Sequence, residues 1–194
     1  MDSSSSIRKV HSLGVGVFPE QVTIRKTTLI ILGSLGWNCA NFTVQDEQGR
    51  AVMKGHPEGR TSSLTGEDGK EVYEIHRRLG FSKKTCTVSS AGREVMEVVQ
   101  KNMSFKTRMT ATFTDALSGD SRTLSLLGDW KAKNFGVKTE DGDEVACVKR
   151  SYGKHWGYHY ALTVEEGVDL VLMSALAVCL VVSSMEDEQA VVVA

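Results

Sequence analysis

The sequence predicts a mainly β protein whose antiparallel strands close around one hydrophobic C-terminal helix. Three observations lead to this fold class. A hairpin pattern with glycine at its tip recurs along the chain, 18 glycines stand against 2 prolines, and the least polar segment lies close to the C-terminus. Frequent glycine suits tight turns, and an apolar fraction of 41% in 194 residues is enough for one buried core.

The repeated pattern is an apolar strand end, a polar turn that contains glycine, and a second apolar strand. Clear copies span residues 42–54, 64–75, 86–98 and 135–148, and a looser copy spans residues 111–126. Gln-Gly, Asp-Gly and Ala-Gly at the tips supply the positive φ that short hairpin loops demand. With further strands near residues 22–24, 29–31 and 156–164, we expect roughly a dozen strands.

Side chains alternate along these strands, as they do in a sheet with one buried face. Leu124 and Leu126 share one face, whereas Thr123 and Ser125 share the other. In residues 156–164 every second side chain is aromatic or aliphatic. The strands therefore need an apolar partner on one side.

The apolar run near the C-terminus supplies that partner. Its 13 residues from Leu170 to Val182 would make a helix of roughly 20 Å, which is short of the ~30 Å core of a bilayer. Acidic residues bracket the run, no lysine or arginine flanks it, and Asp169 is placed to cap it. Because the run is apolar all round, we expect a core helix at about residues 168–183 that strands enclose. Two packed sheets with an appended helix, or insertion into a membrane surface, are the alternatives.

The rest of the chain indicates one domain. We expect residues 1–17 to be a flexible N-terminal segment, residues 18–185 a single barrel domain, and residues 186–194 a flexible tail. The N-terminus lacks the apolar region of a secretory signal, and neither end carries a lipidation motif. The cysteines have no CxxC spacing, so we expect buried, reduced thiols. They are Cys39, Cys86, Cys147 and Cys179.

No catalytic or metal-binding constellation is present in the sequence. The spacings of a nucleophile elbow, a P-loop, a zincin and an EF-hand are all missing. His155 and His159 would lie about 13 Å apart on one face of a strand, too far for one ion. The acidic run at residues 140–144 lacks the length and terminal glutamate of a calcium loop. We therefore expect a non-enzymatic protein without a metal or other cofactor.

Basic residues cluster in three segments that the fold can bring to one end. The first surrounds Phe81, the second surrounds Phe105, and the third runs from Lys149 to Lys154. Together they would hold a phosphoinositide headgroup or an anionic membrane surface, with about 1 kcal/mol from each basic residue. The residues expected to bind anionic lipid are Arg77, Arg78, Lys83, Lys84, Lys106, Arg108, Lys149 and Arg150. The alternative is that they are ordinary solvated residues balanced by 24 acids.

Four parts of the chain carry a resemblance to a known family: VTIRKTTLIILG with FTVQDEQGRAV, GKEVYEIHRR, GDWKAKNFGVKTEDGDEVACVKR, and YALTVEEGVDLVLMSALAVCLVV. From about residue 18 to residue 182, the chain resembles the plant LURP-one-related proteins. The distinctive element is Tyr-x-Leu-x-Val-x-x-Gly-Val-Asp followed by the apolar run. Two features depart from that family: Glu166 stands where proline is frequent, and the connection at residues 32–42 is longer than usual.

The resemblance implies the fold shared by the tubby C-terminal domain and the phospholipid scramblases. That fold is a closed antiparallel barrel of twelve strands around a central hydrophobic helix, so the resemblance adds the strand count and the closure. Neither the tubby lipid site nor the scramblase calcium activity is carried over, because no residue-by-residue match supports either.

The resemblance also implies a binding or adaptor module in plant signalling or defence, related to membrane-tethered tubby-like regulators. Its partners would be an anionic membrane lipid and an unidentified protein. We expect a cytoplasmic monomer, peripheral at the plasma membrane, without a transmembrane span. With a net charge of −1, nucleic acid is not an expected partner. A phospholipid-handling, scramblase-like protein is the alternative function.

Overall fold

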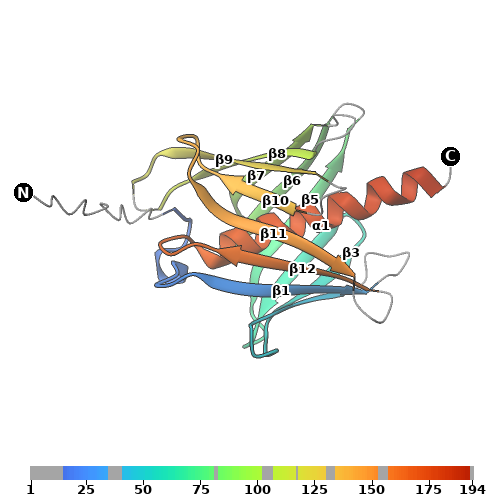
Figure 1. Cartoon of the computed structure of the whole chain (residues 1–194), viewed down its shortest axis with the longest axis horizontal. Helices are drawn as coiled ribbons and strands as arrows, with labels where there is room; N and C mark the ends of the chain where they lie inside the picture. The colour runs from blue at the N-terminus through green and yellow to red at the C-terminus, as the bar shows by residue number, and fades with distance from the viewer. Residues whose placement is uncertain are drawn as a thin grey trace, which may run out of the picture.

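The computed structural model describes residues 15–34, 41–80, 83–101, 107–116, 118–129, 134–152 and 157–192. Within these residues, twelve strands form one closed barrel around a long helix (Figure 1). The elements are η1 (Pro19–Gln21), β1 (Thr27–Ser34), β2 (Phe42–Gln45), β3 (Ala51–Glu58), β4 (Thr61–Gly66), β5 (Glu71–Leu79), β6 (Lys83–Ser90), β7 (Arg93–Lys101), β8 (Thr107–Thr114), β9 (Ser121–Asp129), β10 (Asn134–Lys138), β11 (Glu144–Tyr152), β12 (Gly157–Val164) and α1 (Leu170–Val192).

Every strand pairs antiparallel with the strand that precedes or follows it in the chain. The barrel closes where β12 returns to β1, in a register that runs from Thr27 opposite Val164 to Ser34 opposite Gly157. Closure removes both sheet edges, which would otherwise present unpaired backbone groups. The predicted closed barrel of about twelve strands is confirmed, and the alternative of two packed sheets is wrong.

The hairpin tips lie where the sequence predicts them. All five predicted tip glycines have positive φ: Gly49, Gly69, Gly92, Gly119 and Gly142. Between β6 and β7, Ala91 also has a positive φ of 49° and Gly92 follows at 72°. Two successive positive-φ residues match the twist of a tight hairpin, and glycine at the second position lowers the steric cost.

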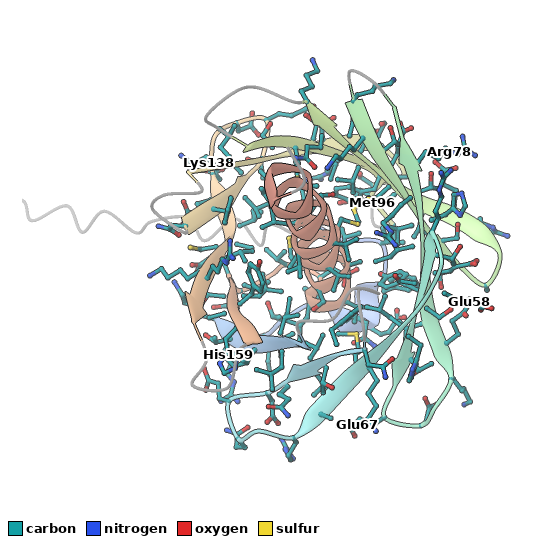
Figure 2. The ribbon with its side chains drawn as sticks, turned by 90° about the vertical axis from the view of Figure 1, so that its right-hand side faces the viewer. Glu58, Glu67, Arg78, Met96, Lys138 and His159 are labelled. Carbon is teal, nitrogen blue, oxygen red and sulfur yellow. The ribbon has the colours of Figure 1, made fainter. Side chains whose placement is uncertain are left out.

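The core consists of the inner barrel face and the circumference of α1 from residue 171 to residue 183. Leu124, Leu126, Tyr160, Leu162 and Val164 are all buried, as their alternation predicts. Every helix residue from 171 to 183 is also buried. The predicted core helix is therefore enclosed by strands on all sides, and Figure 2 shows it along the barrel axis. In the part of the chain that the structure describes, no helix is both long and apolar enough to cross a bilayer.

A segment before β1, residues 15–23, closes one end of the barrel, and we call it the strap. Val15 is fully buried and bridges Val168, and Val22 bridges Asp169. Two reciprocal backbone bonds, Thr23 N–H to Val168 O and Gly167 N–H to Thr23 O, hold the strap on the β12–α1 connection. The short strand predicted at residues 22–24 is therefore absent, because these residues pair with that connection and not with a strand.

Two predicted boundaries differ from the structure. The domain includes Val15, three residues before the predicted start, because that side chain is part of the core. The helix begins at Leu170 and continues to Val192, so residues 186–192 of the predicted tail are helical. Figure 1 shows α1 running past the ends of the strands on the side away from the strap.

Candidate functional site

The twelve strands define two ends of the barrel that differ in character. The strap end carries the strap and the start of α1. At the opposite end, β5, β7, β9 and β11 finish and α1 leaves the barrel. Strand-terminal basic residues gather at this second end, which we call the basic end; it includes Arg77, Arg78, Lys83, Lys84, Lys101, Lys149 and Arg150.

The alternation of strand side chains splits neighbouring basic residues between the two faces of the barrel wall. On β5, Arg77 points inward and is only 8% exposed, whereas Arg78 points outward (Figure 2). One Arg77 guanidinium nitrogen, Nη2, donates to the carbonyl oxygen of Gly59 at 2.7 Å. Arg77 therefore ties the β3–β4 turn to the inner wall and does not face a membrane surface.

The pair at the start of β6 is split in the same way. Lys83 is exposed, whereas Lys84 is half-buried and its Nζ lies 3.5 Å from the carbonyl oxygen of Ser183 on α1. A lysine that reaches a helix carbonyl from the barrel wall helps to position α1. Only Lys83 of this pair faces the exterior.

On β11, Lys149 is exposed and Arg150 is buried. The guanidinium carbon of Arg150 lies 6.0 Å from the ring centroid of Tyr160, its register partner on β12. Stacking on an aromatic face suits a guanidinium that is held out of water. Arg150 therefore belongs to the interior of the basic end.

The other predicted lipid-binding positions lie partly outside the described residues. Lys106 is outside them, as are Phe81, Phe105 and Lys154. The backbone of Arg108 lies on β8 opposite Lys101 of β7. Among the predicted residues that the structure describes in full, the exposed ones are Arg78, Lys83 and Lys149. The period-2 alternation, applied to each adjacent basic pair, is the sequence signal that would have separated them.

At the strap end, Asp169 joins three pieces of backbone. Its Oδ1 accepts N–H bonds from Val171 and Leu172, both at 2.9 Å, which confirms the predicted helix cap. Its Oδ2 accepts N–H bonds from Val17 at 3.0 Å and Phe18 at 2.8 Å. Burial raises the pKa of Asp169 above its usual range, although the backbone donors act in the opposite direction. This carboxylate is a structural clamp.

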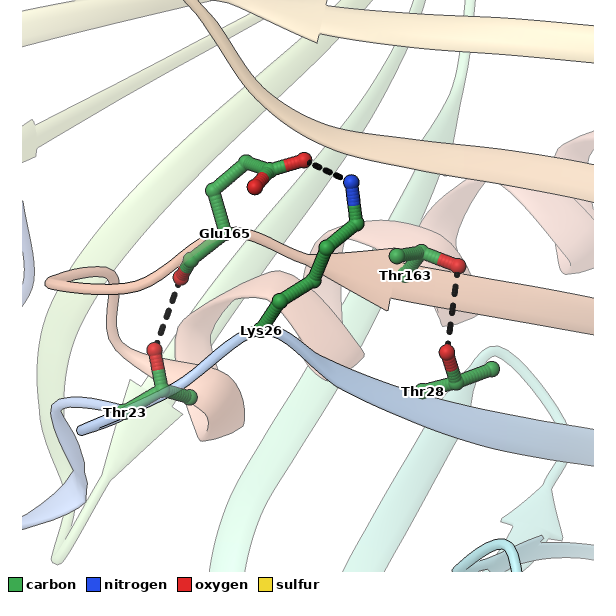
Figure 3. Close-up of polar contacts among 5 residues, drawn as sticks. All are labelled: Thr23, Lys26, Thr28, Thr163 and Glu165. Atoms are coloured by element: carbon green, nitrogen blue, oxygen red, sulfur yellow. Dashed lines mark hydrogen bonds and ion pairs between the residues drawn. The ribbon is translucent and has the colours of Figure 1, made fainter.

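The connection after β12 adds a second, more exposed attachment (Figure 3). Thr23 Oγ1 donates to the carbonyl oxygen of Glu165 at 2.7 Å, and Lys26 Nζ lies 2.5 Å from the Glu165 carboxylate. The bond to Glu165 raises the pKa of Lys26. Thr28 and Thr163 share a hydrogen bond of 3.3 Å across β1 and β12. The Thr23 bond fastens the strap to the connection after β12, and the other two contacts join β1 and the residue before it to β12 and that connection.

The described cysteines are free thiols. Cys86 and Cys179 are buried, and a mutual hydrogen bond together with burial raises the pKa of Cys179. Burial also raises the pKa of Cys147, whose Sγ lies 3.1 Å from Asn134 Oδ1. The raised pKa values keep the sulfurs of Cys147 and Cys179 protonated and weak as nucleophiles. Cys39 lies outside the described residues.

The predicted metal-like motifs gather no ligand set in the described ranges. His159 lies on the outer face of β12, while His155 is outside those ranges. Residues 140–143 lie in the exposed β10–β11 tip, and Glu144 begins β11. No group of three histidine, cysteine or carboxylate side chains that could hold an ion occurs among the described residues.

The described residues line two hollows at the strap end. One of about 630 Å³ is bounded by the strap at Val17 and Phe18, by the β6–β7 hairpin at Arg93 and Glu94, and by Thr114 of β8. The other, about 280 Å³, lies beside Asp120, Arg122 and Thr139. Neither one contains any of the predicted lipid-binding residues.

Comparison with solved structures finds a protein of similar fold. An X-ray structure of a protein from Arabidopsis thaliana is similar, with a TM-score of 0.63 and 17% identity over 88% of this chain and 99% of that chain. At that identity the similarity establishes the fold alone. No protein of curated function matches the chain. The LURP-one-related family model matches residues 22–181, from the strap to α1. That match covers most of the chain, which therefore belongs to the LURP-one-related family.

Proposed function

We propose that this LURP-one-related protein is a non-enzymatic binding module whose basic end contacts anionic membrane lipid, including phosphoinositides. The supporting observation is that α1 fills the barrel while exposed cations from β5, β6, β7 and β11 gather at one rim. A filled barrel leaves its outer surface and rims for binding. Cations near an anionic membrane surface contribute about 1 kcal/mol each.

Membership of the LURP-one-related family supports a role as an adaptor in plant signalling or defence, related to tubby-like regulators. In this proposal the protein is a cytoplasmic monomer that reaches the plasma membrane peripherally and presents the rest of its surface to a protein partner. Light scattering of the purified protein with and without vesicles tests the monomeric state. A dimer in the absence of lipid would contradict that part of the proposal.

A phospholipid-handling function would require α1 to leave the barrel. Residues 171–183 of the helix are all buried against the strands. If α1 moved into a bilayer, the apolar side chains of the inner barrel face would lose their partner and meet water, at a cost of about 1.5–3 kcal/mol for each large side chain. This balance supports the proposal of surface contact with an intact barrel.

Vesicle co-sedimentation tests the proposal. The purified chain is mixed with vesicles of phosphatidylcholine alone, with added phosphatidylserine, and with a phosphoinositide at matched total charge. We expect binding to both anionic preparations, no binding to phosphatidylcholine alone, and weaker binding at high salt because screening shortens the electrostatic range. No binding to either anionic preparation at low salt would reject the lipid function.

A further inference from the structure

We infer that the outer face of β6–β9 at the basic end is a membrane-docking strip that responds to bilayer charge density and not to one particular headgroup. The strip consists of Lys83, Lys101 and Leu127. This inference rests on the proposed function and specifies the surface and the lipid selectivity that carry it. It excludes the inward residues Arg77, Lys84 and Arg150 from direct lipid contact.

Cross-strand register places the three residues in one row. Lys83 of β6 is opposite Lys101 of β7, Lys101 is opposite Arg108 of β8, and Arg108 is opposite Leu127 of β9. Residues directly opposite each other share one face of a sheet, and neighbouring strands lie about 4.8 Å apart. The row therefore extends about 14 Å along the rim. Lys83, Lys101 and Leu127 are all exposed, which identifies this as the outer face.

The row places two like charges directly opposite each other. Like charges in this position destabilise a sheet. In the described part of the chain, neither Lys83 nor Lys101 forms an ion pair with a carboxylate. The adjacent outward row, on the strap side, reads Arg78, Thr85, Val99, Thr110 and Ser125 and contains no acid. The first acid on β7 toward the strap end is Glu97, in the row after that. An external anionic surface would compensate the repulsion.

The row ends in an exposed apolar side chain. Leu127 is 43% exposed and is one of two exposed large hydrophobic residues in the described ranges. Its other register neighbour is Gly136 on β10, which has no side chain to cover it. Cations beside an exposed apolar group match the membrane interface, where the cations meet headgroups and the apolar group reaches the acyl boundary. A nucleic acid would attract the cations but would offer no apolar environment for Leu127.

The shape of the strip argues against recognition of a single headgroup. Its residues stand in a line on the convex outer wall of a barrel, and neither described hollow includes any of them. A specific headgroup needs donors that converge from several sides, whereas a line of cations follows the charge density of a surface. Phosphatidylserine and a phosphoinositide should therefore bind equally at equal surface charge.

A matched pair of double variants tests the strip. K83Q/K101Q removes two charges from it, and K54Q/K138Q removes two exposed charges from β3 and β10, outside the strip. On phosphatidylserine-containing vesicles we expect K83Q/K101Q to bind on the order of thirty-fold more weakly and to lose part of its salt dependence. The control double variant should bind as the wild type does. Circular dichroism and thermal unfolding verify that both variants are folded.

A second pair of variants tests the apolar part. L127Q should weaken vesicle binding several-fold while leaving the salt dependence unchanged. The substitution removes an apolar side chain that the bilayer would bury, and it leaves the charge of the strip unchanged. I24Q alters the other exposed large hydrophobic residue, at the strap end, and should bind as the wild type does. A single-stranded oligonucleotide that bound as tightly as vesicles, without sensitivity to L127Q, would overturn the assignment to a bilayer.

The outcomes separate the strip from the broader proposal. If wild type binds no anionic vesicle, the proposed function fails and the strip fails with it. If wild type binds but the two double variants weaken binding equally or not at all, the strip is wrong and lipid binding stands. Strong preference for the phosphoinositide at matched charge would overturn the claim of charge-density recognition. Selective loss in K83Q/K101Q and L127Q supports the strip.

Discussion

At the scale of single residues, one carboxylate determines how the barrel is closed at the strap end. Asp169 is fully buried and accepts four backbone N–H bonds, two from the first turn of α1 and two from the strap. The same residue caps the helix and holds the chain that precedes β1. A substitution there disconnects two parts of the molecule at once.

We expect D169A to lower the free energy of unfolding by about 3 kcal/mol or more, because it removes a helix cap and two charged hydrogen bonds. D169N should lose less, since one carbonyl oxygen still accepts from one pair of N–H groups. Urea denaturation measures the free energy of unfolding of both variants. E166Q is the control, because Glu166 is an exposed neighbouring acid. A loss in D169A no larger than in E166Q would show that the clamp contributes nothing.

The raised pKa of Asp169 adds a pH dependence to that comparison. A carboxyl whose pKa is higher in the folded chain than in the unfolded chain contributes most to stability at pH values below its unfolded pKa. That contribution to stability is lost as the pH rises through the raised, folded pKa. The stability difference between wild type and D169N should therefore narrow as pH rises toward neutrality. Urea denaturation across that range measures the difference, and a gap that widens would contradict the raised pKa.

At the scale of elements, cross-strand pairs decide which substitutions each strand tolerates. On the inner face, Phe135 of β10 lies over Gly128 of β9, and Phe42 of β2 lies over Gly55 of β3. On the outer face, Lys83 and Lys101 form a like-charge pair. The inner pairs are optimised for packing, whereas the outer pair opposes folding and is proposed to serve binding.

G128A should destabilise the barrel by about 1–3 kcal/mol, because the new methyl group would lie 1.9 Å from Cδ1 of Phe135. Its matched control is G136A on β10, where the methyl group would meet only the end of the flexible Glu144 side chain, at 3.1 Å. Chemical denaturation of both variants measures the difference. Equal stability of the two would show that the phenylalanine ring moves aside without cost.

K83E should stabilise the protein by about 0.2–1 kcal/mol, because it converts a like-charge cross-strand pair into an opposite-charge pair with Lys101. The same variant should bind anionic vesicles poorly. Thermal unfolding at low salt measures the first effect, and K54E, whose register neighbours are Thr43 and Thr65, is the control. A lower melting temperature in K83E than in K54E would show that the lysine pair does not repel.

At the scale of the whole molecule, the barrel and α1 depend on one another. The strands need an apolar filling, and the helix needs a container on every side, so neither part buries its apolar surface alone. Buried charges of opposite sign lie at opposite ends of the barrel. The described buried acids, Asp115 and Asp169, lie at the strap end, whereas Arg77 and Arg150 lie at the basic end. We expect the fold to unfold as one unit.

Hydrogen exchange tests this dependence. Amides of residues 173–182 should exchange only through global unfolding, and anionic vesicles should leave their protection unchanged, because the proposed docking uses the outer wall. Amides of the exposed β10–β11 tip provide a fast-exchanging reference. Faster exchange in the helix on adding vesicles would contradict an intact barrel at the membrane and would favour withdrawal of α1.

The sequence by itself determined the strand-rich class, the five glycine hairpins, the buried apolar helix, its Asp169 cap and the family. These features are local or periodic, so they depend on neighbours a few residues away. Only the tertiary structure decided that Asp169 also holds the strap, that Arg77 and Arg150 turn inward, and that Lys83 meets Lys101. Alternation separates two adjacent residues onto opposite faces, but closure of the barrel around α1 decides which face is inside and which strands meet.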